Sequence, residues 1–199
     1  MGLLNGSATY QQYLVLGQTP SEEALDKGLI EHQIRPFQDG SEVERVGFCN
    51  WQNSLLAPEA GLSLLDGGRA LVAVLIETRK VPAKILKAHV DLKIRSYQKE
   101  KNAAFIGKDL RQMFKDEVQA ALINKYPPAQ KTIEAIWDIK NGRLLTGATS
   151  TKAEGALRTM MYKAFGVELQ PMLPAHRASA AGIAVGDIEA VVAMDLEVQ

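Results

Sequence analysis

The chain has 199 residues, of which 46% are hydrophobic, and its 23 Lys and Arg balance its 23 Asp and Glu to a formal net charge of zero. This apolar fraction excludes a disordered chain, and a single cysteine excludes a disulfide scaffold. The longest apolar run, 70–76, is too short to span a membrane, and the first residues lack the basic segment of a secretory signal. We therefore expect a cytoplasmic protein.

The first part of the chain predicts strands separated by one helix. Ser21 followed by two glutamates predicts a helix start, and the helix should end before Pro36. Its expected buried residues are Ala24, Leu25, Leu29 and Ile30. Strands are predicted over 9–17, 45–51 and 69–78. The third of these strands is apolar almost throughout, which is typical of burial on both faces.

Two long helices are predicted in the middle of the chain, over 83–101 and 108–124. Pro82 stands at the start of the first, where its missing N–H costs nothing, and Pro127-Pro128 ends the second. In each helix the apolar residues recur at a spacing that places them on one side. They are Leu86, Val90, Ile94 and Tyr97 in the first, and Ile106, Leu110, Met113, Phe114, Val118, Ala121 and Leu122 in the second.

The last third of the chain predicts a β-hairpin, a helix and further strands. Asn141-Gly142 between two apolar runs predicts a type I′ turn. Thr151 and Glu154 form a capping box that opens a helix reaching residue 165, which Gly166 closes. Strands are predicted over 132–139, 144–146, 167–173 and 188–198, the last two separated by a loop over 174–186.

These elements predict an α+β fold, with a mixed, mainly antiparallel sheet, packed helices and a long two-helix hairpin. We expect residues 1–199 to form one domain, because a chain of this size can bury a sufficient core. Within it, residues 79–131 form a basic helical hairpin subregion.

The zero net charge hides an uneven distribution along the chain. Residues 1–78 hold 4 basic and 10 acidic side chains, residues 79–131 hold 13 basic and 5 acidic, and residues 132–199 hold 6 basic and 8 acidic. The middle segment thus has a net charge of +8, and a local block of one sign creates a local field whatever the total.

The cations of the middle segment form a row on each predicted helix. They are Lys84, Lys87, Arg95 and Lys99 on the first helix, where Asp91 is the one acid of that side, and Lys108, Arg111 and Lys115 on the second. Such rows can follow a phosphate backbone, with affinity supplied by released counterions. On the residues alone a solvated helix face is favoured, since Lys is a good helix former.

Other candidate sites are weaker. The helix start at 149–152 suits a phosphate oxygen, but ordinary capping explains it. His32, His89 and His176 lie far apart in sequence, no phosphate-binding loop motif is present, and we expect no cofactor. Cys49 is interpreted as a reduced core residue and Asp138 as the start of the hairpin turn.

Aromatic residues flank the basic rows and could stack on bases of a single strand. These are Tyr97, Phe105, Phe114 and Tyr126. Since Tyr97 and Phe114 lie on the apolar sides of their helices, we interpret the set as core residues.

Several segments together resemble the recombination-associated protein RdgC family over roughly residues 70–174. The first is Arg79-Lys80-Val81-Pro82-Ala83 with Leu86-Lys87, followed by the basic helix pair. The others are Ile136-Trp137-Asp138 with Asn141-Gly142, and the run from Ala148 to Glu154. Order and spacing, rather than any one motif, carry the resemblance.

The resemblance implies a bacterial protein that binds DNA without sequence preference. It further implies a nucleoid-associated homodimer, ring-shaped around duplex DNA, that restrains the RecA recombinase by competing for DNA. The family also carries an older label of exonuclease, and its better-known members extend further at the carboxyl end. Its two helix-start motifs correspond here to Lys80, Pro82 and Lys87, and to Ser150, Thr151 and Lys152.

We therefore expect a DNA-binding protein without enzymatic activity. The expected phosphate contacts are Lys80, Lys84, Lys87, Arg95, Lys99, Lys108, Arg111, Lys115 and Lys152. Two alternatives stay open: a metal-dependent nuclease that uses Asp138, and a helical module that binds an acidic protein.

Overall fold

The computed structural model describes residues 9–38, 40, 42–65, 67–172 and 182. The predicted loop over 174–186, apart from Gly182, and the predicted strand over 188–198 lie outside the described residues. The elements, in chain order, are β1 (Gln11–Leu16), α1 (Glu22–Glu31), β2 (Glu44–Cys49), β3 (Leu64–Leu65), β4 (Arg69–Thr78), α2 (Ala83–Lys101), α3 (Lys108–Leu122), a 3₁₀ turn η1 (Ile123–Lys125), β5 (Ala129–Asp138), β6 (Arg143–Thr146), α4 (Thr151–Phe165) and β7 (Glu168–Pro171).

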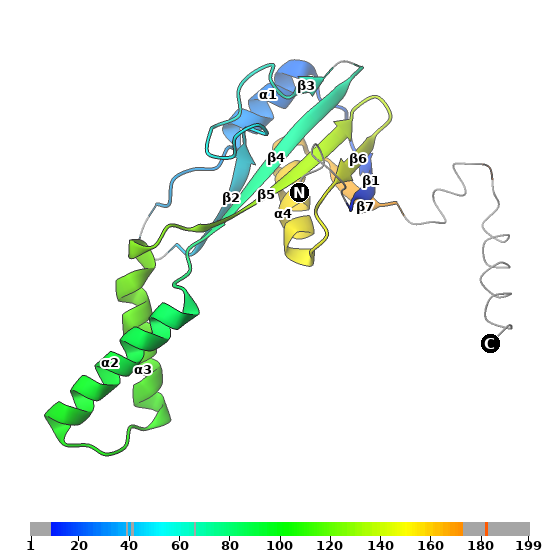
Figure 1. Ribbon diagram of the computed structural model, residues 1–199. Coiled ribbons are helices and arrows are strands. Elements are labelled where there is room, and N and C mark those ends of the chain that lie inside the picture. The colour runs from blue at the N-terminus through cyan, green and yellow to red at the C-terminus, as the bar shows by residue number, and fades with distance from the viewer. Residues whose placement is uncertain (1–8, 39, 41, 66, 173–181, 183–199) are drawn as a thin grey trace, which may run out of the picture. The chain divides into compact units, whose positions relative to one another are not determined.

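The strands form one sheet in the order β2-β4-β5-β6-β1-β7, with β3 beside β4 (Figure 1). The pairs β5–β6, β6–β1, β1–β7 and β3–β4 are antiparallel. One parallel bridge, between Gln33 and Phe48, adds to the sheet's edge. The predicted α+β class is confirmed.

The chain divides into two compact units. The first comprises the described residues of 1–33, 48–74 and 133–199, and the second those of 34–47 and 75–132. The second unit contains the whole basic segment 79–131.

The core of the first unit is built around three aromatic rings. The Phe165 ring centroid lies 5.9 Å from that of Phe48 and 5.5 Å from that of Trp137. Gly28 brings α1 close to α4, because a Cβ there would lie 2.5 Å from the Phe165 ring. The buried side of α1 is therefore Leu25, Gly28 and Leu29, and the prediction of Ala24 and Ile30 as buried residues is wrong.

The hairpin between β5 and β6 is confirmed, but its predicted type I′ turn is wrong. Asp138 pairs with Arg143, which leaves a loop of four residues, and Gly142 has a φ of 59° while Asn141 lacks the positive φ that type I′ requires. The Asp138 carboxylate accepts hydrogen bonds from the backbone N–H (3.1 Å) and side-chain amide (2.9 Å) of Asn141. These bonds hold the pKa of Asp138 below its usual value, and they confirm its role at the turn.

Helix α4 starts and ends with different cap chemistry. The Ser150 hydroxyl accepts from the Ala153 N–H at 3.3 Å, so Ser150 is the N-cap. The predicted capping box of Thr151 and Glu154 is therefore wrong, because the residue three positions after the N-cap is Ala153. At the other end Gly166 has a φ of 66° and donates its N–H to the Tyr162 carbonyl at 2.9 Å. The closing glycine is as predicted.

Two glycines of α4 provide a matched pair of substitutions. A Cβ at Gly166 or at Gly155 would meet nothing within 4 Å, so only backbone conformation separates them. Gly166→Ala should lower the free energy of unfolding by about 1 kcal/mol, because L-residues disfavour positive φ. Gly155→Ala, within the helix, should raise it by about 0.5–1 kcal/mol. Urea unfolding measures both, and equal effects would contradict the assignment of Gly166 as the cap.

Candidate nucleic-acid interface

Helices α2 and α3 form a hairpin (Figure 1), which is held together by its own apolar contacts. Val90, Ile94 and Phe114 are buried between the helices with Ile106, which precedes α3. Leu86, Tyr97, Leu110 and Val118 pack against this cluster. The rings of Tyr97 and Phe114 meet edge to face at 5.4 Å, a favoured geometry for aromatic pairs. The predicted apolar sides of both helices are confirmed, except that Met113 and Ala121 are exposed.

A second cluster anchors the open end of the hairpin. Val81, Leu122 and Ile123 are buried together, with Ile85 and Tyr126 packed against them. The 3₁₀ turn η1 follows α3 directly, so α3 ends at Leu122 and is shorter than the helix predicted over 108–124. Because both ends of the hairpin contribute to this cluster, the two helices are fixed at their base.

All nine cations predicted to contact phosphate are exposed. Lys80 precedes α2 in the second unit, and Lys152 lies in the first turn of α4 in the first unit. The remaining seven form what we call the basic face: Lys84, Lys87, Arg95, Lys99, Lys108, Arg111 and Lys115.

The two rows of the basic face turn toward the same side of the hairpin. At about 100° per residue, and viewed from the start of each helix, the row on α2 lies about 130° clockwise from the residues that contact α3. The row on α3 lies about 90° clockwise from the residues that contact α2. Because the helices are antiparallel, the same sense of rotation carries both rows to one side.

Three acids of the hairpin, Glu100, Asp109 and Glu117, lie on its opposite side. Lys93 and Glu117 lie about 60° anticlockwise from the contacts of their helices, and they form an ion pair there. Lys93 also lies over the Phe114 ring, 5.3 Å from its centroid. The same helical phase places Glu100 and Asp109 on this side. Positive and negative charge are therefore segregated across the hairpin.

Among the described residues, no carboxylate forms an ion pair with the basic face. Across the described residues, none of its seven cations has an ion pair within 4.0 Å. Asp91 is the acid on this face, one helical turn from both Lys87 and Arg95. Uncompensated cations repel one another, and an approaching polyanion relieves that repulsion.

The second unit also contains a cluster of charged, polar and aromatic side chains around β4 that the sequence did not indicate. Glu77 of β4 is only 4% exposed, and it forms an ion pair with Arg45 of β2. Its other oxygen accepts from Gln130 Nε2 at 2.6 Å. The guanidinium carbons of Arg45 and Arg79 lie 4.3 Å and 3.9 Å from the Phe37 ring centroid. These contacts join the segment before β2 to the strand that leads into α2.

Phe105 is the aromatic residue whose predicted burial is wrong. It lies in the loop between α2 and α3 and is 83% exposed, whereas Tyr97 and Phe114 pack in the hairpin and Tyr126 is half-buried at its base. The apolar character of Phe105 gave no signal of this, because Ile106 beside it takes the buried position.

Candidate sites for chemistry gain no geometric support in the described part of the chain. Cys49 is buried, with its Sγ 3.7 Å from the Ala73 carbonyl oxygen, and burial raises its pKa to about 12. Among the described residues no group of three or more His, Cys, Asp and Glu could hold a metal ion. Asp138 is engaged in its turn.

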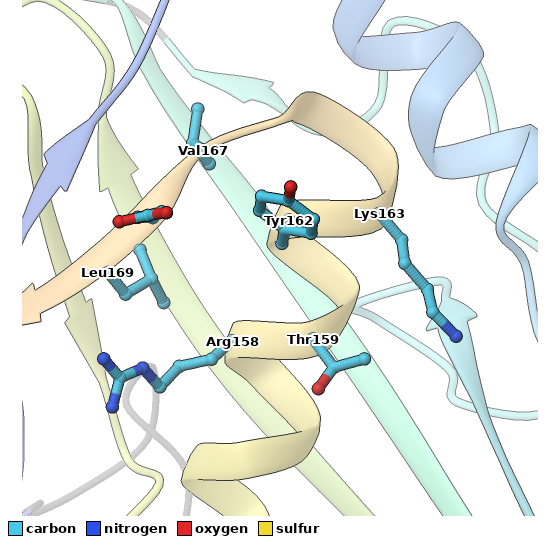
Figure 2. Close-up of a pocket in the computed structure, with 7 residues that line it drawn as sticks. Arg158, Thr159, Tyr162, Lys163, Val167 and Leu169 are labelled. Atoms are coloured by element: carbon cyan, nitrogen blue, oxygen red, sulfur yellow. The ribbon is translucent and has the colours of Figure 1, made fainter.

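An open pocket of the first unit lies between α4 and β7 (Figure 2). It is lined by Arg158, Thr159, Tyr162, Lys163, Val167, Glu168 and Leu169. Figure 2 shows Arg158 and Lys163 extending in opposite directions, and Arg158 is paired with Glu154 at 3.3 Å. These two cations do not converge on a point where one anion could bind both.

Comparison with known proteins identifies a family. The model of the family described as "Putative exonuclease, RdgC" matches residues 11–182, which includes the whole α2–α3 hairpin. No curated protein matches the chain. In the part of the chain that the structure describes, no helix has the length and apolar character needed to cross a membrane.

Proposed function

Because the chain belongs to the RdgC family, we propose that it is a recombination-associated protein that binds DNA without sequence preference through the basic face. The observation that carries this proposal is the gathering of seven exposed cations, none in an ion pair among the described residues, on one side of the hairpin. The protein would act by occupying DNA, and we assign it no enzymatic step.

The dimensions of the hairpin suit a phosphate backbone. Helix α2 has 19 residues and is therefore about 28 Å long, close to the rise of one duplex turn. Lysine and arginine neutralise phosphates whatever the base sequence, and the released counterions supply affinity. The acids on the opposite side would keep that side away from DNA.

The assembly and setting of the protein form part of the same proposal. A homodimer would present two basic faces, and a ring-shaped dimer would hold duplex DNA between them. Occupied DNA is closed to other proteins, so the protein would restrain the RecA recombinase by competition. With these roles the protein would act at the nucleoid, in the cytoplasm.

Binding to random-sequence oligonucleotides over a salt series tests the proposal. We expect similar affinity for duplexes of unrelated sequence, and log K falling linearly with log salt at about 0.9 per contacted phosphate on duplex DNA. Single strands of the same length give the strand preference, and the molar mass of free and bound protein gives the assembly. Affinity that does not respond to salt would contradict binding through the basic face.

The exonuclease of the family description is not the function we favour. Metal-dependent nucleases hold Mg²⁺ with several converging carboxylates, and the described residues offer no such group. End-labelled DNA incubated with the protein and Mg²⁺ or Mn²⁺ should stay intact. Loss of the label, abolished by Asp138→Asn, would instead support the nuclease alternative.

A further inference from the structure

The loop between α2 and α3 holds Phe105 in an ordered but exposed position. Asn102 ends α2 with a φ of 50°, and the Ala103 N–H donates to the Gln98 carbonyl at 3.1 Å. The Gln98 side chain donates in turn to the Ala104 carbonyl at 3.3 Å. On the other side of Phe105, Ile106 is buried in the hairpin core. The backbone is therefore fixed on both sides of an aromatic ring that is 83% exposed.

An exposed phenylalanine on a fixed loop is costly to the free protein. Burial of a Phe side chain stabilises a protein because it removes apolar area from water, and Phe105 forgoes this gain while its neighbour Ile106 is buried. A ligand that covers the ring would recover this free energy. The loop is thus suited to a partner with an apolar surface the size of an aromatic ring.

The charges around Phe105 identify the chemistry of that partner. Lys99 and Lys101 end α2, and Lys108 begins α3, so cations flank the ring on both sides of the loop. Two acids stand among these cations: Glu100 is exposed and lies 3.7 Å from the Lys101 ammonium, and Asp109 follows Lys108 in the first turn of α3. A ligand that offers anionic groups and flat apolar faces at close spacing is a nucleic acid whose bases are unpaired.

We propose that Phe105 stacks on an unpaired base of single-stranded DNA while the flanking lysines contact its phosphates. This inference rests on the proposed function and adds to it a preference that the basic face alone does not give. Phosphate contacts are available on single and double strands alike, whereas a base face is open to stacking only where pairing is absent.

Phe105→Ala tests the inference, with Phe105→Trp as the variant that keeps an aromatic ring. Leu92→Ala is the matched control, since Leu92 is a 59% exposed apolar residue of α2. Each is titrated with an oligo(dT), with an abasic strand of equal length and with a duplex, and its molar mass is measured. We expect Phe105→Ala to bind oligo(dT) about 10-fold more weakly, from about 1–3 kcal/mol per stacked base.

The expected pattern is specific to stacking. Phe105→Ala should bind duplex and abasic DNA within twofold of the original protein, and Phe105→Trp and Leu92→Ala should retain affinity for oligo(dT). Unchanged oligo(dT) binding by Phe105→Ala would overturn the inference while leaving the proposed function intact. An equal loss on all three DNAs with a lower molar mass would also overturn it, by showing that Phe105 joins two copies of the chain. If the original protein binds none of the three DNAs, the result contradicts the proposed function and, with it, the inference that rests on that function.

Discussion

Simultaneous replacement of Lys84, Lys87, Lys108 and Arg111 by Ala should weaken duplex DNA binding about 10²- to 10³-fold at 0.1 M salt. Each lost phosphate contact should also reduce the salt slope by about 0.9. The loss should be uniform across sequences, because phosphate contacts carry no sequence information. Titration of random duplexes over a salt series measures both effects. The substitutions should not unfold the protein, since all four side chains are exposed.

A second quadruple variant controls for net charge. Lys27, Lys140, Arg143 and Lys163 are also three lysines and one arginine, are exposed, and lie in the first unit. Their replacement by Ala changes the charge by the same amount and should alter DNA affinity far less. Equal losses for the two quadruple variants would show that only total charge matters, and would remove the basic face as the binding surface.

Arg45→Met should lower the free energy of unfolding by about 3 kcal/mol, the largest single-residue effect that we expect. The substitution leaves the 4%-exposed Glu77 carboxylate without its cationic partner and removes a guanidinium from the Phe37 ring. Breaking a buried ion pair is costly because the remaining charge stays desolvated. Urea unfolding at neutral pH measures the change.

Two further variants separate this mechanism from general loss of charge. Lys27→Met breaks the Lys27–Glu31 pair, whose side chains are well exposed, and should change stability by less than about 0.5 kcal/mol. The double variant Arg45→Met/Glu77→Leu removes both charges and should be more stable than Arg45→Met alone. If Arg45→Met proves no more destabilising than Lys27→Met, the buried pair does not stabilise the fold.

Elements defined by local pattern could be predicted from the sequence. Strand β4 and helix α2 begin and end where their apolar patterns and flanking residues place them. The contact residues of the hairpin could also be predicted, because a 3.6-residue period fixes which side chains face the partner helix. That same period puts the cations of each helix in a row, so the candidate interface could be predicted from the sequence.

Features that depend on distant residues could not be predicted. Glu77 lies in an almost wholly apolar strand, and its partners Arg45 and Gln130 are 32 and 53 residues away in sequence. The burial of Gly28 depends on Phe165 in the same way. Phe105 and Ile106 are adjacent and both apolar, and only the packed hairpin decides which one is buried.

The hairpin leaves the sheet at Thr78 and returns at Ala129, on strands that are neighbours in the sheet order. Contacts at both ends of these strands, Gly68 with Ile139 and Glu77 with Gln130, show that they run in opposite directions. Residues 79–128 are thus an insertion where a tight turn would suffice. Matched turns added to or removed from both helices would change the reach of this insert by about 5.4 Å each without altering the scaffold that carries it.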